Sequence, residues 1–274
     1  MKKGLFLIIL IFFNSQINSQ EDEWESYIVE KDKGPIAISV NMKYEYARPN
    51  YKNLLIVGKH TTKCLKNGYP SEKGLEKMYT FSDSIATIVD RLTKNRLVGI
   101  LTYQCSGFDI FYVKDTTDLR KTILTQINKN FNDSKTYLEI EGDKKWKYYH
   151  ESLYPSDDSQ EFLMNHELLT GLVYNGDKLT QPRKITHWFY FLRDKKRQKF
   201  IDKIRTLDFT IDSLNYKKKR RYPYELQVSR KDSVNPTSIL KLTKSLTNFA
   251  NLLYSEYDGW SAPLVIDTLP KKSD

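Results

Sequence analysis

Cysteine is scarce in this chain, which holds two, Cys64 and Cys105, among 274 residues. A fold built on disulfides needs several pairs, and a cysteine zinc site needs more ligands at closer spacing, so both classes are excluded. The four histidines do not replace the missing ligands, because no two of them lie three or four residues apart, as in a helical metal site. We therefore expect neither a metal ion nor a cofactor.

Long apolar runs are equally scarce, and the one at Leu5–Phe13 is too short to span a bilayer comfortably. It follows Lys2 and Lys3, and the polar stretch Asn14–Gln20 comes after it. This order is typical of a secretory signal peptide. We therefore expect residues 1–20 to be removed, and the mature protein to be periplasmic or secreted and not transmembrane.

What the chain does have is hydrophobic periodicity, which divides it into two halves. After an N-terminal hairpin, Glu25–Val29 and Ile36–Val40, the first half alternates strand and helix patterns. The expected elements are a strand Leu54–Lys59, a helix from Ser71 to Leu92, strands Leu97–Tyr103 and Phe108–Val113, a helix capped by Asp115 and running to Phe131, and a strand Tyr137–Ile140. This β-α-β-β-α-β order predicts a ferredoxin-like unit with the hairpin added at one edge or face.

A polar connector with scattered aromatic residues, Asp143–Ser159, marks the expected boundary, and the same order then repeats. The run Pro182–Phe191 is rich in β-formers and predicts a central strand covered on both faces. The other expected elements are a helix Gln160–Thr170 ending at Gly171, a helix Arg193–Leu207, strands Phe209–Leu214 and Tyr224–Val228, a helix from Pro236 capped by Asn235, and a closing strand Tyr257–Ile266. The predicted fold class is α+β, with two tandem ferredoxin-like units.

This topology brings the two cysteines to one end of the first sheet. The first and second strands of the unit are parallel, so Cys64, beyond the first, and Cys105, after the second, lie at the same end. The third strand separates those strands by roughly 10 Å, so the loop that carries Cys64 must close the distance. We predict a disulfide with a Cα separation below about 7 Å.

The second half contains Gly176-Asp177, Arg183, Ile185-Thr186-His187 and Tyr257-Asp258-Gly259-Trp260. With these residues, 158–267 resembles the regulator of ribonuclease E activity B family. The resemblance implies a ferredoxin-like fold and a non-catalytic module that regulates by binding a protein. The family's named member is cytoplasmic and acidic, whereas this chain is basic and carries a leader, so the named partner is not carried over.

The first half, 23–150, resembles domain of unknown function 695, which is often found fused ahead of a unit of the second kind. The resemblance rests on Trp24, Gly34-Pro35 followed by Ala37, Leu97-Val98-Gly99 and Phe111-Tyr112. It implies no activity.

His187 is the candidate for chemistry, since a strand histidine beside an acid can act as a base. Asp258 lies near it in the predicted topology, but no serine or cysteine is marked as a nucleophile. We therefore expect a hydrogen-bonded structural histidine and no enzyme activity. Trp260 has two interpretations, a core plug or a surface anchor for a partner, and the first is preferred.

The densest charge lies in the hairpin between the second and third strands of the second unit, Lys217, Lys218, Lys219, Arg220 and Arg221. Such a run is usually a solvated tip, yet five cations can also hold a phosphate-rich polymer or an anionic membrane surface. No RNA-binding signature accompanies them, so specific nucleic-acid recognition is not expected.

Three functions follow from these features. We expect an exported, non-catalytic interaction or regulatory module whose protein partner the sequence does not identify. The alternatives are a binder of anionic polymers or membranes through residues 217–221, and an enzyme centred on His187.

Overall fold

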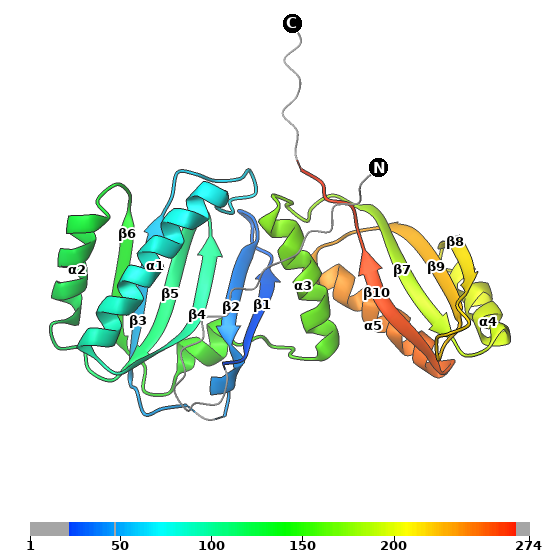
Figure 1. Ribbon diagram of the computed structural model, residues 1–274, viewed down its shortest axis with the longest axis horizontal. Coiled ribbons are helices and arrows are strands. Elements are labelled where there is room, and N and C mark those ends of the chain that lie inside the picture. The colour runs from blue at the N-terminus through cyan, green and yellow to red at the C-terminus, as the bar shows by residue number, and fades with distance from the viewer. Residues whose placement is uncertain (1–21, 47, 267–274) are drawn as a thin grey trace, which may run out of the picture.

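The computed structural model describes residues 22–46 and 48–266 and forms two antiparallel sheets flanked by helices (Figure 1). The predicted signal peptide lies outside the described residues. The first half contains β1 (Trp24–Val29), β2 (Ile36–Asn41), η1 (Met42–Tyr44), β3 (Asn53–His60), α1 (Glu72–Leu92), β4 (Asn95–Tyr103), β5 (Ser106–Val113), α2 (Leu119–Asn130) and β6 (Thr136–Gly142). The second half contains η2 (Tyr149–Leu153), α3 (Gln160–Tyr174), β7 (Arg183–Phe191), α4 (Asp194–Arg205), β8 (Thr210–Tyr216), β9 (Tyr224–Asp232), α5 (Pro236–Leu252) and β10 (Ser255–Ser261).

The two sheets share one strand order. The six-stranded sheet runs β1-β2-β4-β5-β3-β6 and the four-stranded sheet β10-β7-β9-β8. The hairpin β1–β2 pairs with the edge of β4. Without it, each unit has its first strand, β3 or β7, between its third strand and its last. All neighbouring strands are antiparallel. The prediction of a mixed α+β protein with helices on sheets is confirmed.

Helix starts follow local hydrogen bonding. Asn235 caps α5 as predicted, because its Oδ1 accepts the backbone N–H of Ser238 at 2.8 Å. Asp115 does not cap α2: its carboxylate accepts the backbone N–H of Thr117, and the helix begins at Leu119, three residues later than that cap implies. Helix α3 continues past Gly171 to Tyr174.

The first sheet is covered on both faces. Helices α1 and α2 cover one face, through residues such as Phe81, Ile85 and Ile123. The other face is covered by the segment expected to be a polar connector, which places Trp146, Tyr149 and Leu153 in the core. That expectation was wrong because the aromatic residues among the polar ones face inward: Trp146 stacks on Tyr112 with ring centroids 3.9 Å apart.

The second sheet is covered on one face. Figure 1 shows α4 and α5 behind its strands, and α3 lies between the two sheets. Two apolar clusters fill the space under these helices; one contains Phe189, Phe200 and Leu246, the other Ile185 and Trp260. In the described part of the chain, no helix covers the opposite face.

Helix α3 joins the two units. The imidazole Nδ1 of His166 accepts the backbone N–H of Ile28 in the edge strand β1 at 3.0 Å. Asn67, in the loop after β3, donates its side-chain amide to the carbonyls of Val173 at 2.7 Å and Asp177 at 3.0 Å. Because these groups are buried, the contacts hold the first sheet, α3 and the second sheet together.

Candidate interaction surface on the second sheet

The Tyr257-Asp258-Gly259-Trp260 segment forms a β-bulge in β10. Ordinary alternation would send Tyr257 and Trp260 to opposite faces of the strand. The register shifts between Tyr257 and Gly259, so Asp258 is an extra residue and both aromatic side chains face the helices. Gly259 has a φ of 108°, which favours glycine over residues with a side chain. The motif therefore places the side chains of Tyr257 and Trp260 on the same, helix-covered face of the sheet.

His187 forms a hydrogen bond with the first of these aromatic residues, Tyr257. Its Nδ1 lies 2.8 Å from the Tyr257 hydroxyl, and the side chain is fully buried beside Phe209. Burial, aided by the nearby Arg230 charge, lowers the pKa of His187 to about 3, so the ring is neutral at physiological pH. A substrate has no access to a ring in this position, and Asp258 points to solvent, away from it.

Trp260 is the centre of a second polar contact in the core. Its indole N–H donates to Asn165 Oδ1 at 2.7 Å, and the Asn165 amide donates to Thr243 Oγ1 at 2.7 Å. This chain links β10, α3 and α5, and Trp260 is only 6% exposed. Of the two interpretations of Trp260, the geometry is that of a core plug.

Asp177 and Arg183 form a buried ion pair at the start of β7. The Asp177 carboxylate accepts two guanidinium N–H groups of Arg183 and the backbone N–H groups of Leu179 and Val265. Burial alone would raise the pKa of Asp177, but these hydrogen bonds outweigh it and hold the pKa below its ordinary value. The Gly-Asp and Arg motifs thus stabilise the junction with α3.

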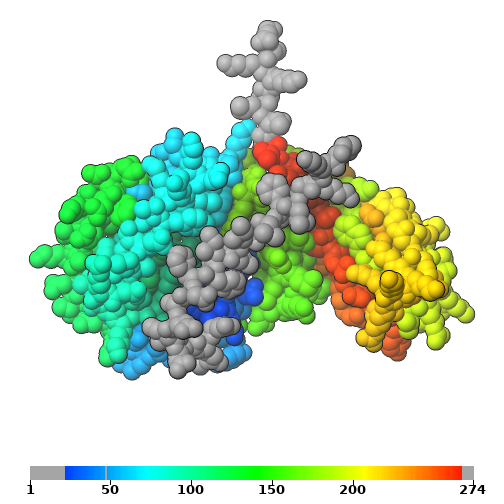
Figure 2. All heavy atoms as spheres, in the orientation of Figure 1, coloured from blue at the N-terminus to red at the C-terminus, as the bar shows by residue number. Residues whose placement is uncertain are grey.

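The helix-free face of the second sheet carries the residues between those inward positions. Trp188 lies half-buried at its middle, opposite Gly259 in the register, where the absence of a side chain leaves open space. Gln227 lies directly opposite it in the register, and Thr186 lies on the same face; both are polar and partly exposed, whereas Ser229, opposite Thr186, is buried. In Figure 2 this face of the second unit is turned toward the viewer. The prediction that β7 is covered on both faces was wrong, because Lys184, Thr186 and Trp188 alternate with the inward residues and stay at least partly exposed.

The basic hairpin folds back over this open face. Lys217 forms an ion pair with Glu225 of β9, and the Arg220 guanidinium carbon lies 4.1 Å from the centroid of the Tyr190 ring. Tyr190 is therefore only 5% exposed although no helix covers it. All five cations are exposed, but they are not equivalent: Lys217 and Arg220 also contact Glu225 and Tyr190 of the sheet. Lys218, Lys219 and Arg221 form the rim of the hairpin.

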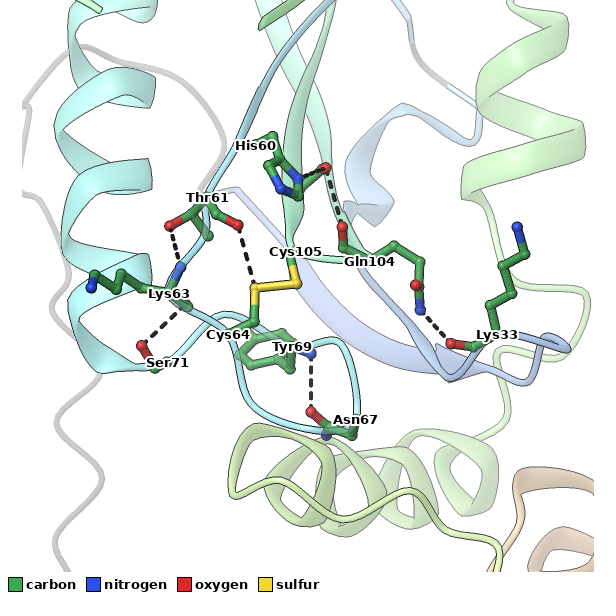
Figure 3. The surroundings of a disulfide bond; sticks show 11 residues. Lys33, His60, Thr61, Lys63, Cys64, Asn67, Tyr69, Ser71, Gln104 and Cys105 are labelled. Carbon is green, nitrogen blue, oxygen red and sulfur yellow. Dashed lines mark hydrogen bonds between the residues drawn. A yellow bond between two sulfur atoms is a disulfide. The ribbon is translucent and has the colours of Figure 1, made fainter. Parts of the chain in front are cut away.

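Cys64 and Cys105 are joined by a disulfide with a Cα separation of 5.8 Å (Figure 3). The bond fixes the loop after β3 to the turn between β4 and β5. The same loop carries Asn67, whose Oδ1 also accepts the backbone N–H of Tyr69 at 3.0 Å. The disulfide therefore stabilises the loop that contacts α3.

Sequence reasoning missed that Trp188 and Tyr190 lie on the helix-free face of the sheet, and that Asn165 is the partner of Trp260. Strict alternation along β7, with Ile185, His187 and Phe189 inward, could have found the first two. The hydrogen bond between Asn165 and Trp260 joins elements far apart in the sequence, so no local sequence pattern predicts it.

Within residues 22–46 and 48–266, no cluster of three or more histidine, cysteine or acidic side chains is arranged to hold a metal ion. None of the helices in those ranges has the length and apolar character needed to cross a membrane.

The geometry defines a two-unit α+β protein whose second sheet has one open face. Residues 22–154 match the family described as "Family of unknown function (DUF695)", and residues 163–262 match "Regulator of ribonuclease activity B". The two matches stand in the predicted order, so the predicted fusion is confirmed.

A search of curated proteins finds no match. Among solved structures, the chain is similar to the crystal structure of a candidate glycine cleavage system transcriptional repressor, with 8% identity over 78% of this chain and 100% of that one. The TM-score is 0.23, so this likeness supports no inference about fold or function.

Proposed function

We propose that this protein is an exported, non-catalytic regulatory module that binds a protein partner through the helix-free face of its second sheet. We interpret its two halves as tandem ferredoxin-like units. The family matches support a regulatory or interaction role, and the leader-like first 20 residues support export. The observation that carries the proposal is the open face itself, with Trp188 at its centre and polar side chains around it.

The composition of this face is that of a protein interface. A half-buried aromatic side chain surrounded by hydrogen-bonding groups is typical of a binding hot spot, in which the aromatic residue supplies most of the affinity. The motif residues His187, Tyr257 and Trp260 contribute from the opposite side of the sheet, where they fix the strand that presents Trp188. Their role in the proposal is structural.

The test compares what the mature protein captures from the cell envelope with and without Trp188. Trp188→Arg should lose a partner that the wild type retains. Leu124→Arg, on the exposed surface of α2 in the first unit, is the matched control and should retain it. Both variants should unfold within a few degrees of the wild type. Equal retention by the two variants would refute the proposed surface.

A second function rests on the rim of the hairpin. Lys218, Lys219 and Arg221 are exposed together, so they can hold an anionic polymer or membrane surface. Replacing all three by Gln should then reduce retention on heparin or on phosphatidylglycerol vesicles, and that retention should already weaken with salt. Unchanged retention would exclude this function.

A further inference from the structure

A cavity of about 140 Å³ lies in the first unit, under the N-terminal half of α1 and beside α3. Its floor is two rows of side chains across neighbouring strands of the sheet. One row is Ser39, Ile100 and Asp109, and the next is Ala37, Thr102 and Gly107. Most of these side chains are small, so the helix above them cannot close onto the sheet.

The sequence keeps this space open. A Cβ on Gly107 would lie 3.2 Å from the Met78 sulfur, so a larger residue would begin to fill the space between β5 and α1. Further along α1, Ile85 and Val89 pack directly on the sheet. The cavity is therefore confined to the N-terminal half of α1, the helix that crosses the strands of the first sheet in Figure 1.

Asp109 contributes a carboxyl group to this cavity and is only 5% exposed. Burial raises its pKa to about 6, the Ser82 hydroxyl acts against the rise by donating a hydrogen bond, and the charge of Asp83 adds to it. No basic side chain of the described residues is among the groups that shift this pKa. Lys59 also lines the cavity, but its ammonium bonds to Asp133 Oδ1 at 2.6 Å.

Three tyrosines form the wall toward α3. The rings of Tyr69 and Tyr174 stack with centroids 4.5 Å apart, and Tyr79 lies on the exposed side of α1 next to them. Aromatic faces and phenol oxygens attract cations. Because Tyr174 belongs to α3, the wall is complete only when the two units are docked.

We propose that this cavity binds a small alkylammonium ion, with its ammonium group on the Asp109 carboxylate and its carbon chain against Met78 and Ile100. A buried carboxylate without a basic partner is unfavourable on its own, and a ligand cation would neutralise it. A cavity of about 150 Å³ holds benzene, so this one fits a ligand of about five or six heavy atoms.

The groups facing Asp109 determine how binding depends on pH. They are Lys59 from β3, Tyr69 from the loop, Tyr79 and Asp83 from α1, and Tyr174 from α3. The residues of β2 and β4 that line the cavity do not titrate. An alkylammonium keeps its charge below about pH 10. Affinity should therefore rise between pH 5 and pH 8, as Asp109 ionises.

The experiment titrates the full mature protein with n-butylammonium chloride and follows backbone amide shifts by NMR. Butan-1-ol, which has the same carbon chain without the charge, is the ligand control. We expect shifts at Ser39, Ile100, Thr102 and Asp109, and affinity about tenfold lower for butanol. Asp109→Asn should reduce ammonium affinity about tenfold. Asp90→Asn, which removes an exposed acid at the far end of α1, is the control and should leave the affinity within about twofold.

A second variant tests the space and not the charge. Thr102→Met fills the cavity while Asp109 stays in place, and it should abolish binding. The thermal midpoint of each variant confirms that it is folded. The proposal is overturned if n-butylammonium causes no shifts at these residues, if butanol binds equally well, or if folded Asp109→Asn binds like the wild type.

Discussion

The two sheets have the same strand order but differ in how they are covered. In β3 of the first sheet, Leu54 to Val57 are all buried, because α1 and α2 lie on one face and the segment around Trp146 on the other. In β7 of the second sheet, buried Ile185 and His187 alternate with the more exposed Lys184 and Thr186. The same strand order therefore has both faces covered in the first unit and has one face without a helix in the second.

The largest expected effect comes from the covered face of the second sheet. Trp260→Ala should lower the free energy of unfolding by about 3–5 kcal/mol, because it leaves a cavity and removes the hydrogen bond to Asn165. Trp188→Ala, on the open face of the adjacent strand, should cost less than about 1 kcal/mol. Urea denaturation of both variants measures the difference. Similar losses for the two would show that the faces are not distinct.

Much of this arrangement could be predicted from the sequence. Helical periodicity predicts the helices, and the adjacent residues Asn235 and Pro236 predict the start of α5. The connector was misjudged because polar residues dominate its composition, while its burial depends on an aromatic stack with Tyr112. Of the candidate residues, the orientation of His187 and Trp260 depends on a bulge and on α3, which are tertiary features.

The disulfide should come next in effect. It joins residues 41 apart in sequence, so replacing both Cys64 and Cys105 by Ser should cost roughly 2–4 kcal/mol through the greater freedom of the unfolded chain. Loosening the Asn67 loop should also weaken the contact between the first unit and α3. Hydrogen exchange should therefore become faster at the backbone amides of Ile28 and Val173. Unchanged exchange at both would show that the disulfide does not support the contact between the first unit and α3.

Asp109→Asn should stabilise the first unit, and the effect should depend on pH. The folded pKa of about 6 lies above the ordinary value near 4, so the ionised carboxyl destabilises the fold at pH values above 6. The substitution should add about 2–3 kcal/mol at pH 8, and the gain should vanish as the pH falls below 4, where the acid is protonated in both states. Thermal unfolding at pH 8 and pH 4 checks this, and an equal gain at both would contradict it.

The smallest effects belong to the basic hairpin. Lys217→Gln together with Arg220→Gln should cost about 0.5–1 kcal/mol, because these residues pair with Glu225 and lie over Tyr190. Lys218→Gln together with Lys219→Gln, in the exposed rim, should cost less than about 0.5 kcal/mol. Chemical denaturation of the two double variants measures this contrast. A larger loss of stability from the rim pair would contradict the assignment of Lys217 and Arg220 as the residues that hold the hairpin on the sheet.

The most direct test of the contact surface is site-specific photo-crosslinking in the native cells. A photoreactive phenylalanine analogue replaces Trp188 in one variant and Leu124, on α2 of the covered first sheet, in another. We expect position 188 to yield a discrete adduct with one protein, and position 124 to yield none. An adduct at position 124 with none at position 188 would contradict the assignment of the open face of the second sheet as the binding surface.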